Sequence, residues 1–160
     1  MNVEITPEGL MEVAIAKARE GVAAGQTPFG CAIAREGRVI ASAHNRVLAT
    51  TDITAHAEVN ALREGCRAAR NIFLEGAMVA TTCEPCPMCM AALHWARVET
   101  VYYGATIADA AASGFNELTL SAAELLRQGR SPVKLIGDTL RDECGVLFEE
   151  WRRLPAARAY

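Results

Sequence analysis

The sequence predicts a three-layer α/β/α sandwich, in which a mixed central sheet is covered by helices on both faces. Segments with helical periodicity alternate with short apolar segments along the chain. Two of the apolar segments flank a glycine-containing turn, which is typical of a β-hairpin. The chain also ends in a long amphipathic helix. Together these features favour strands packed between helices over an all-helical or all-strand fold.

The first half of the chain accounts for two helices and the hairpin. Thr6-Pro7 is a helix start, because a hydroxyl can cap free N–H groups and proline suits the first helical position. Gly25 ends this helix. Residues 31–34 and 39–43 form the two arms of the hairpin. After a polar loop, we expect a second helix over about 55–69.

The second half of the chain continues the alternation of strands and helices. The stretch from 105 to 137 has the least clear pattern, with a capped helix and a short strand as its recognisable parts. We expect strands over 77–82, 100–104 and 133–136, and helices over about 87–98, 121–128 and 138–154.

Length, composition and charge limit the function. A chain of 160 residues with 51% hydrophobic and 22% charged residues is typical of one globular domain, which we assign to residues 1–160. We expect a cytoplasmic protein without a membrane partner, because we find no signal peptide and no apolar run near the ~20 residues of a membrane span. The net charge of −3 and the scattered Lys and Arg argue against a nucleic-acid partner.

Two short motifs carry candidate metal ligands. Cys86 and Cys89 are three residues apart at the start of a predicted helix, so both sulfurs can reach one ion. A helix N-terminus also favours thiolates, the form that binds metals. His56 stands at the start of another predicted helix. One histidine and two cysteines suit tetrahedral zinc and leave the fourth position for water, which is typical of a catalytic site.

Glu58 supports the catalytic interpretation. It follows His56 by two residues, close enough to face a water at the zinc without binding the metal. A carboxylate there can transfer protons between water and substrate. Two other interpretations remain open at this point: a redox Cys-x-x-C pair, and a structural zinc site with Cys83 as a fourth ligand.

The motifs resemble those of the cytidine deaminase superfamily and, within it, of the bacterial guanine deaminases. The pattern H-x-E followed by P-C-x-x-C is a signature of zinc deaminases. The resemblance extends over nearly the whole chain and implies a cytidine deaminase-like fold. It is carried by Thr54–Val59, Cys83–Cys89, Trp95–Arg97, Pro28–Gly30, Asp109–Ala111, Gly114-Phe115 and the final Tyr160.

This resemblance implies further site residues and an assembly. The implied substrate-binding residues are Asn45, Phe29, Ala57, Trp95 and Tyr160. Asn45 would bind the purine, and the aromatic rings of Phe29 and Trp95 would stack on it. Glu117 would be a second catalytic acid, although Asn116-Glu117 stands where the family pattern has two aspartates. The resemblance also implies one zinc per subunit and a homodimer that exchanges the C-terminal segment from about 138 to 160.

The implied reaction is the hydrolysis of guanine, a free nucleobase, to xanthine and ammonia. Alternative substrates are an aminotriazine such as ammeline, cytosine or cytidine, and adenosine in tRNA. A zinc module that binds a partner without catalysis is a further alternative. The acids of the last predicted helix argue against tRNA, because RNA binding requires a basic surface.

Overall fold

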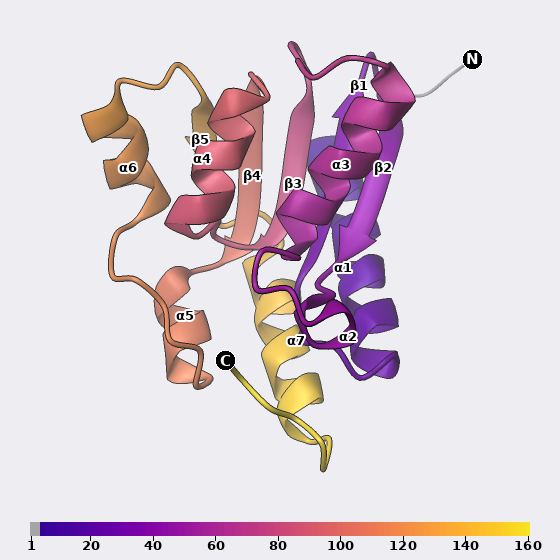
Figure 1. Cartoon of the computed structure of the whole chain (residues 1–160), viewed down its shortest axis with the longest axis vertical. Coiled ribbons are helices and arrows are strands. Elements are labelled where there is room, and N and C mark those ends of the chain that lie inside the picture. Colours follow the sequence, from indigo (N-terminus) through magenta and orange to yellow (C-terminus); the bar gives the residue numbers. More distant parts are fainter. Residues whose placement is uncertain (1–3) are drawn as a thin grey trace.

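The computed structural model describes residues 4–160 and shows a five-stranded sheet with helices on both faces (Figure 1). The strands lie in the order β2-β1-β3-β4-β5. β1 pairs antiparallel with β2 and β3, whereas β3, β4 and β5 are parallel. The predicted three-layer sandwich with a mixed sheet is therefore confirmed. The strands are β1 Gly30–Arg35, β2 Arg38–His44, β3 Met78–Cys83, β4 Thr100–Ala105 and β5 Lys134–Ile136.

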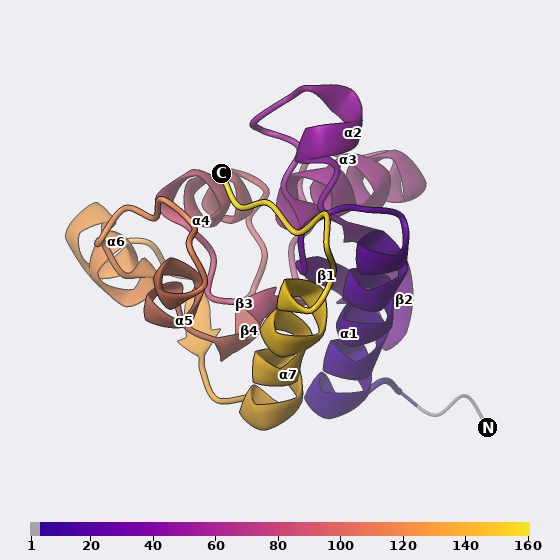
Figure 2. The same ribbon diagram turned by 90° about the horizontal axis from the view of Figure 1, so that it is seen from below.

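Helices cover both faces of the sheet, as Figure 2 shows from below. Helices α1 and α7 pack on one face, and α3, α4 and α6 lie on the other. None of the helices in the described part of the chain is long and apolar enough to cross a membrane. The helices are α1 Pro7–Ala23, α2 Val47–Thr50, α3 Ala57–Ala69, α4 Pro87–Trp95, α5 Ile107–Ala112, α6 Ala122–Gly129 and α7 Arg141–Arg152.

Side chains point alternately to the two faces of the sheet along each strand, and this divides the core into two clusters. Ile33, Val79 and Val101 are fully buried against α3 and α4. Their neighbours Ala32 and Ala80 point to the opposite face, where they pack against α1 and α7. Small residues on that second face let the two helices approach the sheet closely.

Three local differences separate the structure from the predicted elements. The single-turn helix α2 and the six-residue helix α5 were not predicted, since both are too short for an apolar period to show. Helix α4 ends at Trp95 rather than near Val98, because Arg97 adopts a left-handed conformation with φ 58°. All three differences lie in connections, so the order of the sheet is unaffected.

Candidate active site

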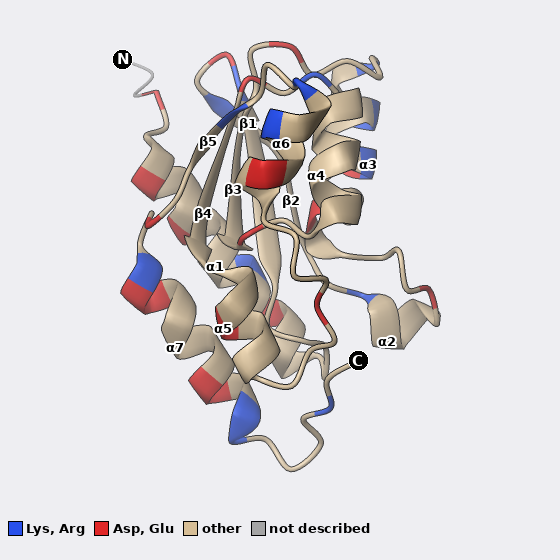
Figure 3. Cartoon of the chain, turned by 90° about the vertical axis from the view of Figure 1, so that its left-hand side faces the viewer, with Lys and Arg blue, Asp and Glu red and all other residues tan. Residues whose placement is uncertain are grey.

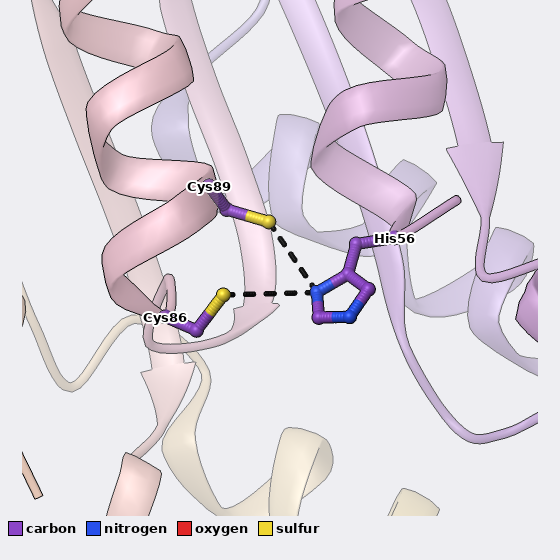
Figure 4. Close-up of side chains that lie close together, drawn as sticks. All are labelled: His56, Cys86 and Cys89. Carbon is purple, nitrogen blue, oxygen red and sulfur yellow. Dashed lines mark hydrogen bonds between the residues drawn. The ribbon is translucent and has the colours of Figure 1, made fainter. Parts of the chain in front are cut away.

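The sheet brings the two predicted metal-binding motifs together. His56 and Cys86 are the residues immediately before α3 and α4, and both helices begin at the same end of the sheet. The Nδ1 atom of His56 lies 3.7 Å from Sγ of Cys86 and 3.4 Å from Sγ of Cys89 (Figure 4). The ligand atoms of these three residues all lie within 4.8 Å of one another.

These separations match a tetrahedral zinc site. With Zn–S near 2.3 Å and Zn–N near 2.0–2.1 Å, tetrahedral angles place nitrogen and sulfur about 3.6 Å apart. The two observed distances lie on either side of this value. A soft set of one imidazole and two thiols also favours zinc over harder cations. The protein is thus suited to bind zinc through His56, Cys86 and Cys89.

The surroundings of Cys86 favour its thiolate form, which is the form that binds metals. A hydrogen bond from Cys89 has the largest effect and lowers the pKa of the Cys86 thiol to about 4, with burial opposing it and His56 adding to it. The start of α4 further favours a thiolate at this position. All six cysteines are free thiols, including Cys86 and Cys89. The redox-pair interpretation therefore has no disulfide to support it.

Cys83 lies outside the metal group. Its buried thiol donates a hydrogen bond to the carbonyl oxygen of Thr106 at 3.4 Å. In the described part of the chain, the metal-binding group comprises His56, Cys86 and Cys89 without it. The structure thus does not support a four-ligand structural site.

Glu58 is buried beside the metal group, in the first turn of α3. Its Oε1 accepts a hydrogen bond from Oγ1 of Thr81 at 3.0 Å, which fixes the orientation of the carboxyl group. Burial raises the pKa of Glu58, against the opposing influence of His56. A raised pKa makes the carboxyl group easier to protonate, so it can take up and release a proton as a general acid–base requires.

A cavity of about 340 Å³ opens beside these groups. Its volume is at the lower end of the range for ligand sites. None of the described residues that line it is Lys or Arg. Its walls are mainly apolar. The lining residues are Phe29, Asn45, Ile53, His56, Glu58, Cys83, Glu84, Cys86, Pro87, Met88, Phe115, Asn116, Glu117, Leu118 and Tyr160.

Asn45 and Tyr160 meet at this cavity from distant parts of the sequence. Figure 2 shows the last residues running from α7 across the end of the sheet toward α4. Nδ2 of Asn45 donates a hydrogen bond to the Tyr160 hydroxyl at 2.6 Å, and its Oδ1 accepts one from the N–H of Val47. Because an amide has two N–H donors, Asn45 retains one for a ligand. Burial is the main cause that raises the pKa of Tyr160 to about 12.

Phe29 and Glu117, two of the residues that the resemblance indicated, also line the cavity. The ring of Phe29 packs edge-on against Phe115 with centroids 4.9 Å apart, which holds it in place. Burial, followed by the nearby Cys86, raises the pKa of Glu117 to about 7. The cavity thus combines an aromatic wall with a second carboxyl group that can hold a proton at neutral pH.

Two of the implied substrate-binding residues lie elsewhere. Trp95 is 77% exposed and is absent from the cavity of its own chain. The reason is geometric: Cys86 and Pro87 at the start of α4 face the cavity, and Trp95 is about 12 Å further along the helix axis. Trp95 therefore cannot stack on a base in the cavity of its own chain, and its role in substrate binding stays a prediction. The Ala57 side chain is fully buried, so only its backbone could meet a ligand.

Sequence reasoning missed several residues of the site. Glu84 and Phe115 belong to motifs that carried the resemblance, but no local signal assigned them to the cavity. Thr81, which orients Glu58, is one of two adjacent threonines in β3, and nothing in the sequence distinguishes it from the other. Ile53 and Leu118 lie at the cavity and are largely exposed, so neither a core pattern nor a motif indicated them.

The fold, the three-ligand metal group and the adjacent carboxyl group are those of a zinc-dependent hydrolase. The family model of the cytidine and deoxycytidylate deaminase zinc-binding region matches residues 5–105, more than half of the chain. The chain therefore belongs to this deaminase family and is a zinc-binding enzyme.

Relatives within the family have different substrates. The chain is 43% identical to a guanine deaminase of Bacillus subtilis over 111 residues, which cover 69% of this chain and 71% of that protein. It is 33% identical to a tRNA-specific adenosine deaminase of Bacillus subtilis over 145 residues, covering 89% and 86%. A solved guanine deaminase of Nitrosomonas europaea superposes with a TM-score of 0.85 at 26% identity, over 93% of this chain and 86% of that one.

Proposed function

We propose that the protein hydrolyses guanine to xanthine and ammonia. The observation that carries this proposal is the form of the cavity, which is small, lacks Lys and Arg among its described lining residues, and is lined by Tyr160 and its hydrogen-bond partner Asn45. Such a cavity suits a neutral, planar base. The similarity to two guanine deaminases supports the same substrate.

The residues of the cavity can perform this reaction. Asn45 binds the base through its remaining N–H, and Phe29 contacts its ring. When bound, zinc supplies an activated water for attack at C2, since the ion lowers the pKa of water to about 7. Glu58 takes a proton from the attacking water and delivers it to the ring nitrogen. Glu117 protonates the departing amine and regains a proton from the hydroxyl group at C2 as the carbonyl forms, so that water and guanine yield xanthine and ammonia.

A tRNA adenosine deaminase is the second candidate, because such enzymes are also similar to this chain. RNA binding depends on clustered cations that displace counterions from phosphates. Figure 3 shows Lys and Arg interspersed with Asp and Glu on the ribbon, and α7 itself carries both signs. This mixed distribution of charge favours a free base over tRNA as the substrate.

The first experiment is ammonia release by the zinc-loaded protein from guanine, ammeline, cytosine, cytidine, adenine and adenosine, with a tRNA substrate in parallel. We expect release from guanine, and a fall of about 10²–10⁴-fold in kcat for Glu58→Gln with zinc content unchanged. Turnover of adenosine in tRNA, with no ammonia released from any free base or nucleoside, would overturn guanine as the proposed substrate. An active E58Q variant would overturn the role of Glu58.

We also propose a homodimer that exchanges its C-terminal segment. In the single chain, Tyr160 reaches Asn45 of its own chain. Exchange would supply the same contact from a partner. Mixing inactive E58Q with a Tyr160→Ala variant tests this, because an exchanged mixed dimer has one site with both Glu58 and Tyr160 intact. Activity should rise on mixing, and an unchanged mixture would exclude the exchange.

A further inference from the structure

Glu84 makes an unusual pair of contacts at the edge of the site. It follows β3 and precedes Cys86 by two residues. Its Oε2 accepts a hydrogen bond from the backbone N–H of Ile107 at 3.1 Å, and its Oε1 accepts one from the N–H of Ala122 at 3.0 Å. These are the first residues of α5 and α6, so one carboxylate joins the starts of two helices.

The two N–H groups are ones that the helices do not satisfy themselves. In α5, Thr106 and Asp109 form a reciprocal capping box that leaves the N–H of Ile107 without an intrahelical partner. In α6, the Ser121 side chain accepts from the N–H of Glu124 and likewise leaves that of Ala122. Glu84 accepts from the free N–H group at the start of each helix, and its negative charge is favourable at helix N-termini.

The chain between these two helix starts carries one wall of the cavity. Phe115, Asn116, Glu117 and Leu118 all line it. Phe115 anchors this segment in the core, but Asn116 and Leu118 are exposed and Glu117 is only half-buried, so the position of Glu117 depends on how the ends of the segment are held. Both ends are attached to Glu84, which belongs to the same loop as Cys86. Between these ends, the N–H of Asn116 donates a hydrogen bond to the carbonyl oxygen of Tyr160 at 3.0 Å.

We propose that Glu84 is a positioning residue that holds Glu117 against the metal site by joining the starts of α5 and α6. This inference rests on the catalytic role proposed for Glu117. A carboxylate suits the task because it offers acceptor oxygens in two directions. Glutamine has one acceptor oxygen and directs an N–H₂ group at the other helix start, so it cannot hold both ends.

A double-mutant cycle separates positioning from a general effect on stability. In Glu84→Gln we expect kcat on guanine to fall about 10–100-fold, because a displacement near 1 Å costs this much, with KM changed less. In a Glu117→Gln background the same substitution should lower kcat by less than about 3-fold, since its effect acts through Glu117. Equal losses in both backgrounds would overturn the proposal.

Glu124→Gln is the matched control. It removes a carboxylate from the first turn of the same α6 helix, but Glu124 pairs with the exposed Arg127 and does not reach Glu84. Its kcat should equal that of the unmodified enzyme. Ala122→Pro is a second route if E84Q does not fold, because it deletes one N–H donor at a helix position that tolerates proline. We expect the same loss of kcat and the same dependence on Glu117.

Amide hydrogen exchange of the zinc-loaded protein tests the bridge without any substrate. Peptides spanning 107–122 should exchange faster in E84Q than in the unmodified protein, and peptides from α1 should not change. Unaltered exchange over 107–122 would overturn the bridge, even if guanine is the substrate. Conversely, faster exchange in a protein that does not act on guanine would retain the bridge and reject the proposed function.

Discussion

Gly30, the first residue of β1, lies directly against the backbone of α1. A Cβ atom added there would be 2.0 Å from the carbonyl oxygen of Ala14 and 2.7 Å from the nitrogen of Ala18. Ordinary contacts between heavy atoms are near 3.5 Å, so Gly30→Ala would force α1 away from the sheet by about 1.5 Å. Both opposing atoms are backbone atoms, and no change of rotamer can relieve the clash.

The expected loss is at the upper end of the usual range for overpacking. Such substitutions cost about 1–3 kcal/mol, and this site has no flexible neighbour, so we expect about 3 kcal/mol. For a chain of this size each kcal/mol lowers Tm by about 2–4 °C, which gives a fall of about 6–12 °C. The neighbouring Phe29 lines the cavity, so kcat/KM should fall as well, even at temperatures where the variant is folded.

Thermal unfolding of the zinc-loaded proteins, followed by circular dichroism, measures this loss. Gly145→Ala is the control, because no atom lies within 4 Å of its added Cβ and it sits inside α7. Alanine should stabilise that helix by up to about 1 kcal/mol. A Tm for G30A within 2–3 °C of the unmodified protein would refute the packing argument, since about 1 kcal/mol or less would then be lost.

Two further predictions concern the metal group and Glu117. Cys86→Ser should lose zinc and show a lower Tm that chelator does not lower further, whereas Cys66→Ser, outside the metal group, should keep one zinc per chain by metal analysis. Equal zinc content in the two variants would contradict the ligand assignment. In zinc-free protein, the raised pKa of Glu117, about 7, means that the folded state binds more protons than the unfolded state between about pH 4.5 and 7. The free energy of unfolding should therefore fall with rising pH in this window, by less in Glu117→Gln, as denaturant midpoints at pH 5 and 7.5 would show. Parallel pH dependence in both proteins would exclude this contribution of Glu117.

The metal group could be predicted from the sequence because its signals are local. Each of its two motifs marks its own helix start, and the cysteine spacing alone places two sulfurs on one side. The fold could be predicted for a similar reason, since most elements are long enough for a hydrophobic period to show. Asn45, Phe29, Glu117 and Tyr160 came from family resemblance, and the structure brings all four to the cavity.

The remaining features depend on contacts that no local pattern encodes. Glu84 joins helix starts 23 and 38 residues further along the chain, and its own neighbours give no hint of either. Helix α5 lies in an alanine-rich stretch without an apolar period, so its capping box was its only local signal. Trp95 was placed by analogy, whereas its position at the end of α4 follows from where that helix stops.

The placement of His56 and Cys86 at the starts of two separate helices has a kinetic consequence. The two residues are 30 positions apart, and they meet only after α3 and α4 have docked on a sheet whose strands are themselves distant in sequence. Zinc would then be captured late, after the rate-limiting step of folding. Interactions absent from the transition state slow unfolding and leave the folding rate unchanged. Bound zinc should accordingly lengthen the lifetime of the native state without hastening its formation.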